Sequence, residues 1–367
     1  MNINILLPHK EIFEKDKLSS VSITVKNNFV HSKFKNNIKI YGQHVENPIF
    51  KENFVGIKNP KLFFKSKNKN LAFQMCKKIT NEDNYNTLIE IHNRPYLIHF
   101  ICKKFKVLNL TLFLHNDPLQ MRGSKSTSER IEILKNVKKV YCVSNYIKQR
   151  FLEGIHKDYQ KVVTLYNGIS FKNKILRKKK LIIFVGKISY EKGAHLFANV
   201  VNQIANLYKN WEFKLIGSSQ LGSNNLSTAY AKNIVHQFKN IGKNAKYLGF
   251  VSNKKVNEIM EIASIVIVPS LWKEPFGLVA AEAMSKGAAV IASNTGGLKE
   301  VVGKYGITID DINESKLKEE IISLIEKKSM LEKIQKISFE NFNFKSKDIS
   351  KKLDGFREEL IHFLYKD

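Results

Sequence analysis

FVGKISYEKGAHLF, residues 184–197, has the pattern of a buried strand, a loop and the start of a helix. Gly186 stands at the strand end and Gly193 at the helix start, but the stretch lacks the G-x-G-x-x-G dinucleotide fingerprint. Lys187 and Lys192 flank the loop instead. Two lysines beside a helix N-terminus suit a diphosphate, whereas an ordinary solvated loop is the alternative in a lysine-rich chain. The stretch therefore predicts an α/β unit and leaves its ligand open.

Short apolar runs alternate with helical stretches on both sides of this unit. The runs are rich in Ile, Leu, Val and Phe and end in polar residues, which is typical of buried strands. Strand–helix alternation predicts a parallel, doubly wound sheet, and its repetition predicts an α/β protein with two Rossmann-like domains. The predicted strands span residues 2–8, 87–93, 108–117 and 138–145 in the first half, and 181–186, 213–217, 246–250, 263–270 and 288–293 in the second.

The predicted boundary between the two domains is NGISFKNKILRKKK, residues 167–180. It opens with an Asn-Gly turn signal and ends in a basic run, which predicts a solvated linker. The N-terminal domain is therefore expected over residues 1–170 and the C-terminal domain over 171–345, while residues 30–70 show no clear pattern. A final amphipathic helix is predicted over about 346–365, with Ile349, Leu353, Phe356, Leu360 and Phe363 on one face.

Composition narrows the class of protein. The 367 residues, 43% of them hydrophobic, are typical of a globular chain with two domains. No apolar run approaches the about 18 residues of a membrane helix, and the N-terminal sequence lacks the pattern of a signal peptide. Cys76, Cys102 and Cys142 are odd in number and far apart, which favours a reducing compartment over disulfides or a zinc site. A cytoplasmic protein is expected.

The formal net charge is +28, from 61 Lys and Arg against 33 Asp and Glu. Such an excess favours an anionic partner: nucleic acid, a phosphorylated ligand or an acidic membrane surface. The alternative is an AT-rich genome, because Lys, Asn and Ile are abundant throughout the chain. The sequence has no helix-turn-helix, zinc-finger or RNP pattern, so a nucleic-acid-binding module is not expected.

Polar residues follow most of the predicted strands. In doubly wound sheets ligands bind at the carboxyl ends of the strands, and with two facing domains the cleft between them is the expected site. The residues that this rule assigns to the predicted cleft are His92, Asn93, Arg94, His115, Asn116, Asp117, Ser144, Gly186, Lys187, Gly217, Ser270 and Glu274.

EPFGLVAAEAM, residues 274–284, brackets an apolar run with two glutamates. Glu274 is predicted in a strand-to-helix turn and Glu282 inside the helix, while the amides of residues 276–278 lie at the helix start without intrahelical acceptors. A carboxylate can accept from two sugar hydroxyls, and amides can serve sugar or phosphate oxygens. The alternative is a buried helix whose glutamates reach solvent.

A similar loop follows the next predicted strand. NTGGLKEVV, residues 294–302, places Gly296 and Gly297 directly before a predicted helix. Glycines permit close backbone approach, so this loop is expected to face the same ligand.

Taken together, these motifs resemble a known family. EPFGLVAAEAM followed by KGAAVIASNTGGLKEVV is similar to the donor-site signature of the retaining, nucleotide-sugar-dependent family-4 glycosyltransferases (glycosyl transferases group 1), which have the GT-B fold. FVGKISYEKG and YNGIS, residues 166–170, also match this family, and VSNYIKQRFLEG, residues 143–154, resembles members that build bacterial surface polysaccharide. The resemblance extends over roughly residues 90–310. It implies two Rossmann-like domains facing across a cleft, with residues 346–367 packing back on the first domain.

The resemblance also implies roles for individual residues. Lys187 and Lys192 would hold the donor diphosphate. Glu282 would bind the ribose of the nucleotide and Glu274 the transferred sugar, which His115 would approach from the other side. The implied catalytic residues are Glu274, His115, Lys187 and Lys192, and the implied donor-binding residues are Gly186, Phe276, Gly277, Leu278, Val279, Glu282 and Asn167.

Two departures from the family pattern stand out. Lys187 occupies a position where arginine is common, and lysine keeps the charge but loses the bidentate fork. The loop after the first strand, residues 8–22, carries Ser19 and Ser20 where the family often has glycines. Contacts to a ligand near that loop are therefore left open.

The implied reaction moves a sugar from a nucleoside-diphosphate sugar, a UDP-sugar above all, to an acceptor hydroxyl with retention of configuration. The acceptor would be a glycan or glycolipid, as in lipopolysaccharide or surface-glycan synthesis. The donor is a substrate, and neither a cofactor nor a metal is expected because the sequence has no D-x-D pattern. The alternatives are a nucleotide-sugar-binding protein without catalysis and an epimerase or phosphorylase of the same fold.

Basic residues of the first domain bear on the acceptor. Arg94, Arg122, Lys125 and Arg130 are predicted near the cleft. They would suit a phosphorylated glycolipid and a peripheral contact with the inner face of an anionic membrane, and generic solvation is an equal alternative. The sequence leaves open the sugar, the nucleotide base, the acceptor and the oligomeric state.

Overall fold

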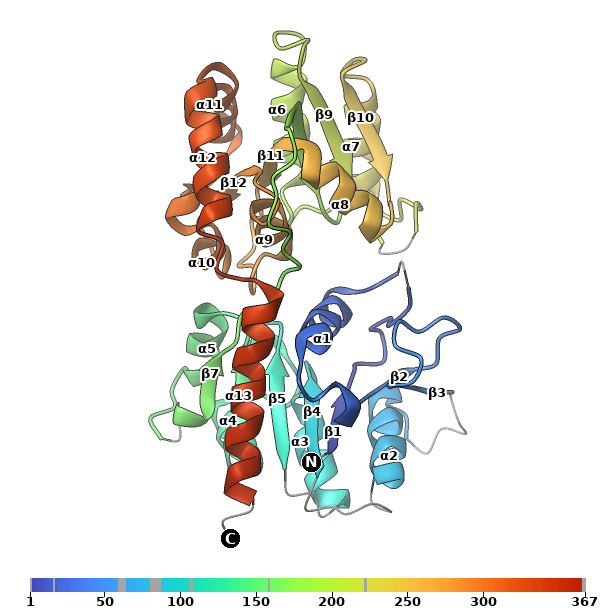
Figure 1. Ribbon diagram of the computed structural model, residues 1–367. Coiled ribbons are helices and arrows are strands. Elements are labelled where there is room, and N and C mark those ends of the chain that lie inside the picture. Colours follow the sequence, from blue (N-terminus) through green and yellow to red (C-terminus); the bar gives the residue numbers. More distant parts are fainter. Residues whose placement is uncertain are drawn as a thin grey trace. The chain divides into compact units, whose positions relative to one another are not determined.

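The computed structural model describes residues 2–15, 17–58, 64–79, 87–105, 109–157, 159–220 and 223–364 (Figure 1). The chain divides into two compact units. Unit 1 comprises Met1–Gly168 and Ser346–Asp367, and unit 2 comprises Ile169–Lys345. Each unit contains one parallel sheet with helices, so the predicted pair of Rossmann-like domains is confirmed.

Unit 1 is built on a sheet in which every described pairing is parallel. The strand order reverses between β1 and β4, which makes this pair the topological switch point of the sheet. All residues of β4 and β5 are buried, as expected for strands covered on both faces. The strands follow the order β3 (Phe54–Ile57), β2 (Ile38–Gln43), β1 (Asn2–Leu6), β4 (Thr87–His92), β5 (Leu110–Leu114), β6 (Lys139–Cys142) and β7 (Val162–Thr164).

The helices of unit 1 follow the strands in alternation. Residues 30–70, which the sequence left unplaced, contain β2, β3 and the start of α2. The helices are α1 (Ser20–His31), α2 (Lys67–Ile79), α3 (Tyr96–Lys104), α4 (Thr127–Asn136), α5 (Asn145–Leu152) and α13 (Ser346–Leu364), with short 3-10 turns η1 (Lys35–Asn37), η3 (Pro118–Gln120) and η4 (Tyr159–Lys161).

The last helix, α13, belongs to unit 1, as the resemblance implied. It lies beside α1 (Figure 1) and buries Ile349 and Leu353 against Phe113 and Tyr141 of the sheet. The side chain of Phe363, predicted on the same face, lies outside the described residues. The helix therefore returns the end of the chain to the first sheet.

Unit 2 has a second parallel sheet, whose switch point lies between β8 and β11. Its buried core includes Phe184, Phe197 and Phe213. The strand order is β10 (Ala245–Gly249), β9 (Glu212–Ile216), β8 (Lys179–Val185), β11 (Ala263–Val268), β12 (Ala289–Ser293) and β13 (Ile307–Ile309). The helices are α6 (Ala194–Ile204), α7 (Ala229–Lys239), α8 (Asn253–Ile262), α9 (Leu278–Met284), α10 (Leu298–Val302), α11 (Glu314–Glu326) and α12 (Lys328–Glu340), with the 3-10 turn η5 (Gly303–Tyr305).

The stretch predicted to be a solvated linker is only partly so. Residues 172–177 are exposed, but Phe171 stacks on Phe342 with ring centroids 5.7 Å apart. Lys178 donates hydrogen bonds to the carbonyl oxygens of Glu261 and Lys286, at 2.9 and 2.6 Å. Phe171 and Lys178 thus anchor residues 171–178 on unit 2, because the aromatic ring and the ammonium each find partners there.

Across the helices that the structure describes, none combines the length and the apolar character that crossing a membrane requires.

Candidate active site

The main candidate site lies at the switch point of unit 2. The loop 186–193 follows β8, and the loop 269–277 follows β11. These two parallel strands are hydrogen-bonded neighbours, so their carboxyl ends meet at one edge of the sheet. In doubly wound sheets the ligand crevice is found at this point.

Glu274 and Lys192 form an ion pair across these two loops. Lys192 Nζ lies 2.5 Å from Glu274 Oε1, and the Ser270 hydroxyl donates to the same oxygen at 2.7 Å. The Glu274 side chain is only 9% exposed, and a buried carboxylate needs such partners to remain charged. The ammonium of Lys192 also lies 5.0 Å from the Trp272 ring centroid. The resemblance assigned Lys192 to the donor diphosphate and Glu274 to the transferred sugar, whereas the structure shows the two side chains paired with each other.

Lys187, the other predicted phosphate ligand, lies at the end of β8 and is exposed. Its side chain forms no ion pair within the described part of the chain. With Lys192 and Glu274 already paired, Lys187 and the exposed Lys273 of the neighbouring loop are the lysines of these two loops that form no ion pair in the described residues. A diphosphate that reached the loops would therefore meet lysines that no carboxylate binds directly.

Glycine fixes the loop 186–193 against the end of β11. Gly193 has a φ of 67° and lies so close to the Pro269 carbonyl that a Cβ atom would overlap it. Only glycine adopts this left-handed backbone conformation without strain in such limited space. The glycine that begins α6 therefore packs two loops together and sets the position of Lys192.

The loop 294–297 packs on the loop of Glu274. Gly296 and Gly297 lie against the backbone of residues 273–276, and the expected contact of their loop with the ligand stays a prediction. The Gly297 amide donates to the Glu274 carbonyl at 2.6 Å. The glycines thus give the loop of Glu274 its shape, because any side chain there would collide with that backbone.

The start of α9 presents backbone donors beside Glu274. Gly277 has a φ of 103°, and its α-carbon faces Leu298 too closely for a side chain. The amides of Gly277, Leu278 and Val279 donate to no acceptor in the described segments. The Phe276 ring is buried against Phe344, at 5.4 Å between centroids, so its ring anchors the turn. These observations agree with the predicted row of amides, apart from the Phe276 amide.

Glu282 lies one turn further along α9 and is half-buried. Burial raises its pKa, and the nearby Lys286 ammonium lowers it. That ammonium donates to the Glu282 carbonyl oxygen at 3.0 Å rather than to the carboxylate. The Glu282 carboxylate has no hydrogen-bond partner among the residues that the structure describes, so it is available to a ligand hydroxyl.

Unit 1 has its own polar cluster at the carboxyl ends of β4 and β5, next to the switch point of its sheet. His92 ends β4 and His115 follows β5, the next strand of the sheet. His92 Nδ1 lies 2.9 Å from His115 Nε2, and the His92 ring stacks on Phe113 at 4.3 Å between centroids. The Asn93 side chain accepts from the His115 amide at 3.3 Å. Two hydrogen bonds therefore fix His115, one through its backbone amide and one through its ring Nε2.

The hydrogen bond between the histidines favours one tautomer. His92 is 2% exposed, and its Nε2 has no hydrogen-bond partner among the described residues. A buried N–H without an acceptor is rarer than a buried acceptor without a donor. His92 therefore carries its proton on Nδ1 and donates to His115, which leaves an N–H at His115 Nδ1 for a ligand. Burial lowers the pKa of His115 to about 4 and that of His92 as well, so both rings are neutral at pH 7.

Other predicted residues are engaged within unit 1. The Asn167 side chain accepts from Thr24 of α1 at 3.1 Å. Arg130, predicted near the cleft, is 2% exposed and donates to the carbonyl oxygens of Ser124 and Lys125. Arg130 is therefore structural and unavailable to an acceptor, which corrects the prediction. The donor-binding role of Asn167 stays a prediction.

Three contacts escaped sequence reasoning. Ser270 was recognised as a strand-end residue, but not as a partner of Glu274. Trp272 and the His92–His115 pairing were not foreseen either. Adjacent positions at the ends of neighbouring parallel strands are the signal that could have revealed the histidine pair. Within the described residues no three His, Cys, Asp or Glu side chains gather as a metal site requires, and metal independence stays a prediction.

Comparison with known proteins agrees with the geometry. Residues 167–340 match the family model described as glycosyl transferases group 1. Spore coat protein SA of Bacillus subtilis is 27% identical over 68% of this chain and 72% of its own length. A lipopolysaccharide 1,2-N-acetylglucosaminetransferase of Salmonella typhimurium is 25% identical over 73% of this chain and 72% of its own.

The fold has solved counterparts. The crystal structure of Anabaena Alr3699/HepE in complex with UDP and glucose covers 98% of this chain and 99% of its own, with a TM-score of 0.73 at 17% identity. Two parallel Rossmann-like sheets with such neighbours define the GT-B fold. The part of the chain that matches the glycosyl transferases group 1, residues 167–340, corresponds to unit 2.

Proposed function

We propose that this glycosyltransferase moves a sugar from a nucleoside-diphosphate sugar, with a UDP-sugar as the first candidate, to an acceptor hydroxyl with retention of configuration. The observation that carries the proposal is the arrangement at the switch point of unit 2. There Lys187 lies in the same loop as Lys192, and the ion pair of Lys192 with Glu274 joins this loop to the one that leads to the unpaired amides at the start of α9. A charged diphosphate and a hydroxyl-rich sugar need these groups together.

The reaction would develop negative charge on the leaving diphosphate. Lys187 and Lys192 are the cations that stabilise it, and fixed donors of this kind contribute about 2.7–4 kcal/mol each to the transition state. Glu274, held by Lys192 and Ser270, presents its remaining carboxylate oxygen to hydroxyls of the transferred sugar. Glu282 serves the ribose, and His115 offers its N–H to the sugar.

A surface glycan is the proposed acceptor. The lipopolysaccharide enzyme of Salmonella typhimurium named above supports this choice, as does the family resemblance of residues 143–154. We place the reaction in the cytoplasm, where nucleotide sugars are available, with unit 1 as the acceptor-binding domain and unit 2 as the donor-binding domain. The net charge of +28 would favour a phosphorylated acceptor or a peripheral contact with an anionic membrane.

A panel of UDP-, GDP- and ADP-sugars tests the proposal. We expect one nucleotide class to raise the melting temperature and to release its diphosphate slowly into water. Lys187→Ala and Glu274→Ala should each lower turnover at least tenfold without unfolding the chain. Lys209→Ala, which removes an exposed lysine of the same unit, is the matched control and should retain full turnover.

The same panel separates the alternatives. A binding protein without catalysis would show the thermal shift and no diphosphate release, and an epimerase would convert the sugar while the nucleotide stayed attached. A phosphorylase would require inorganic phosphate. Loss of turnover in EDTA, reversed by Mn²⁺, would contradict the proposed metal independence.

A further inference from the structure

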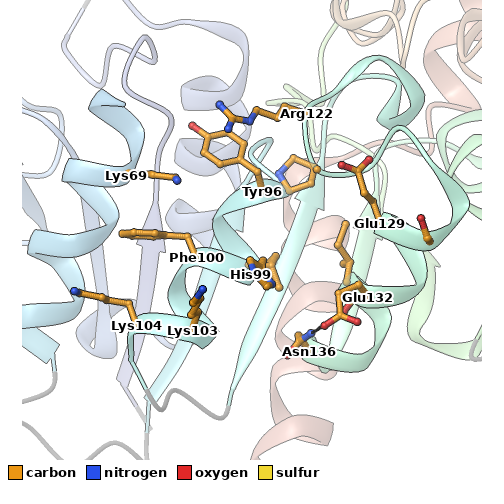
Figure 2. Close-up of a pocket in the computed structure, with 15 residues that line it drawn as sticks. Lys69, Tyr96, His99, Phe100, Lys103, Lys104, Arg122, Glu129, Glu132 and Asn136 are labelled. Atoms are coloured by element: carbon orange, nitrogen blue, oxygen red, sulfur yellow. Dashed lines mark hydrogen bonds between the residues drawn. The ribbon is translucent and has the colours of Figure 1, made fainter. Parts of the chain in front are cut away.

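A cavity lies in unit 1, along α3 where that helix runs between α2 and α4 (Figure 2). Its volume is about 910 Å³, at the upper end of the range for small-molecule sites. Tyr96 and Phe100 of α3 are half-buried there, and the fully buried Ile98 and Ile133 lie beneath them. None of the residues assigned to sugar transfer lines this cavity.

One wall of the cavity is cationic. Lys69 lies 5.3 Å from the Phe100 ring centroid, and the Arg122 guanidinium lies 5.3 Å from that of Tyr96. Lys103 and Lys104 extend the same wall at the end of α3 (Figure 2). None of these four side chains forms an ion pair within the residues that the structure describes. Their positive charge is therefore uncompensated, and the aromatic faces keep it beside the cavity.

The opposite wall, on α4, carries hydrogen-bonding groups. Glu129 closes the capping box of α4 by accepting from the Ser126 amide at 3.1 Å. Glu132 accepts from Asn136 at 3.0 Å and pairs with Lys135 at 3.5 Å. These carboxylates bind groups of their own helix, so they leave the cations across the cavity unpaired (Figure 2). Their remaining oxygen lone pairs can still accept from ligand hydroxyls.

We propose that this cavity binds an acidic oligosaccharide, a chain of sugar rings that carries a carboxylate or phosphate group. Its acidic group would meet Lys103 and Lys104 at the end of α3, its ring faces would cover Tyr96 and Phe100, and its hydroxyls would donate to the carboxylates of α4. The proposal rests on the proposed function, since a glycosyltransferase acts on glycan chains, and it adds a glycan contact separate from the transfer site.

The composition of the walls favours a glycan over other anions. An alkyl chain would remove water from Glu132, Asn136 and Ser128 without offering hydrogen bonds in return, which is costly. A nucleic acid would bring phosphates close to Glu129 and Glu132, where like charges repel. Sugar hydroxyls supply donors to the polar wall, and the single acidic group pairs with the cationic wall.

Isothermal titration of the full chain with a hyaluronan tetrasaccharide, which carries carboxylates, tests the proposal. Neutral chitotetraose, inorganic phosphate, dodecyl phosphate and a short single-stranded DNA are the comparison ligands. We expect the acidic tetrasaccharide to bind at least tenfold more tightly than chitotetraose or inorganic phosphate, and less tightly as salt rises. Preference for dodecyl phosphate or for DNA would overturn the proposal.

Variants locate the binding. The double variant Lys103→Ala/Lys104→Ala should lower the affinity for the acidic tetrasaccharide at least tenfold. The matched control Lys351→Ala/Lys352→Ala removes the same charge from exposed positions of α13 in the same unit and should not lower it. Equal losses in both would show nonspecific charge attraction and overturn the site.

Binding of UDP, measured on the same samples, separates this proposal from the proposed function. It should be unchanged in both double variants. If the tetrasaccharide fails to bind while UDP binds normally, the cavity proposal is wrong and the transfer site stands. If UDP, GDP and ADP all fail to bind to the wild-type chain, the proposed function is wrong regardless of the cavity.

Discussion

The buried ion pair that ties α13 to the first sheet allows a quantitative prediction. The Arg357 side chain is 1% exposed. Its Nε and Nη2 atoms each lie 2.8 Å from a different carboxylate oxygen of Glu90, a buried residue inside β4. Its Nη1 reaches Asp354 at 3.0 Å. Removal of one partner from such a pair leaves an uncompensated buried charge and costs about 3–5 kcal/mol.

Arg357→Met is the direct perturbation. It keeps much of the aliphatic volume and leaves the buried Glu90 carboxylate without its partner, while Asp354 keeps donors from Ser32 and Lys33. Unit 1 should therefore lose about 3–5 kcal/mol of unfolding free energy. For a unit of this size each kcal/mol shifts the melting temperature by roughly 2–4 °C, so a fall of about 10 °C is expected. Urea denaturation followed by circular dichroism gives the free energy directly.

Two controls make the result decisive. Glu359 on the same helix pairs with Lys139 at 2.8 Å, but its side chain is 55% exposed, so Glu359→Gln should cost under about 1 kcal/mol. Adding Glu90→Leu to Arg357→Met should recover part of the loss, because the stranded charge is removed. The reasoning is refuted if Arg357→Met costs no more than Glu359→Gln.

Three further predictions concern the two site clusters. His92→Asn keeps a hydrogen-bond donor near the Nδ1 position and should preserve most of the turnover. His92→Phe keeps the ring stack on Phe113 but removes that donor, so it should lower kcat more than it changes KM. Equal effects of the two variants on kcat would contradict the role of His92 in setting the tautomer of His115. The unfolding free energy of unit 1 should fall as the pH drops from 6.5 towards 4. Burial lowers the pKa of His115 to about 4, so the unfolded state takes up the proton at a higher pH than the folded state does. Urea titrations at a series of pH values would detect this fall. Glu274→Gln should mainly reduce kcat and Glu282→Gln mainly weaken UDP affinity by calorimetry; the reverse pattern would exchange their assigned roles.

Much of the sheet architecture could be predicted because buried parallel strands are continuous apolar runs. The strands that carry the sites, β4, β5, β8 and β11, were all recognised in this way. The strands in residues 30–70 were not, because Lys39 and Gly42 interrupt the apolar pattern of β2 and because β3 has only four residues. The sequence pattern of a strand predicts it poorly when the strand is short or when pairing with its neighbours, rather than its own residues, stabilises it.

The candidate residues could be identified from the sequence, but their partners could not. Lys192 and Glu274 are 82 positions apart, and Arg357 and Glu90 are 267 apart. Such pairs depend on how the loops pack in space. Gly297 illustrates the same limit, since the neighbouring loop that leaves no room for a side chain there lies more than 20 positions earlier in the sequence.

The anomeric configuration of the first sugar released tests the central claim most directly. The wild-type chain is incubated with the α-linked nucleotide sugar that binds, and proton NMR follows the sugar released into water before mutarotation mixes the anomers. A retaining transferase that uses the Lys187, Lys192 and Glu274 site should release the α-anomer first, and Lys187→Ala should abolish most of this signal. First release of the β-anomer, or no release from any nucleotide sugar, would contradict the account.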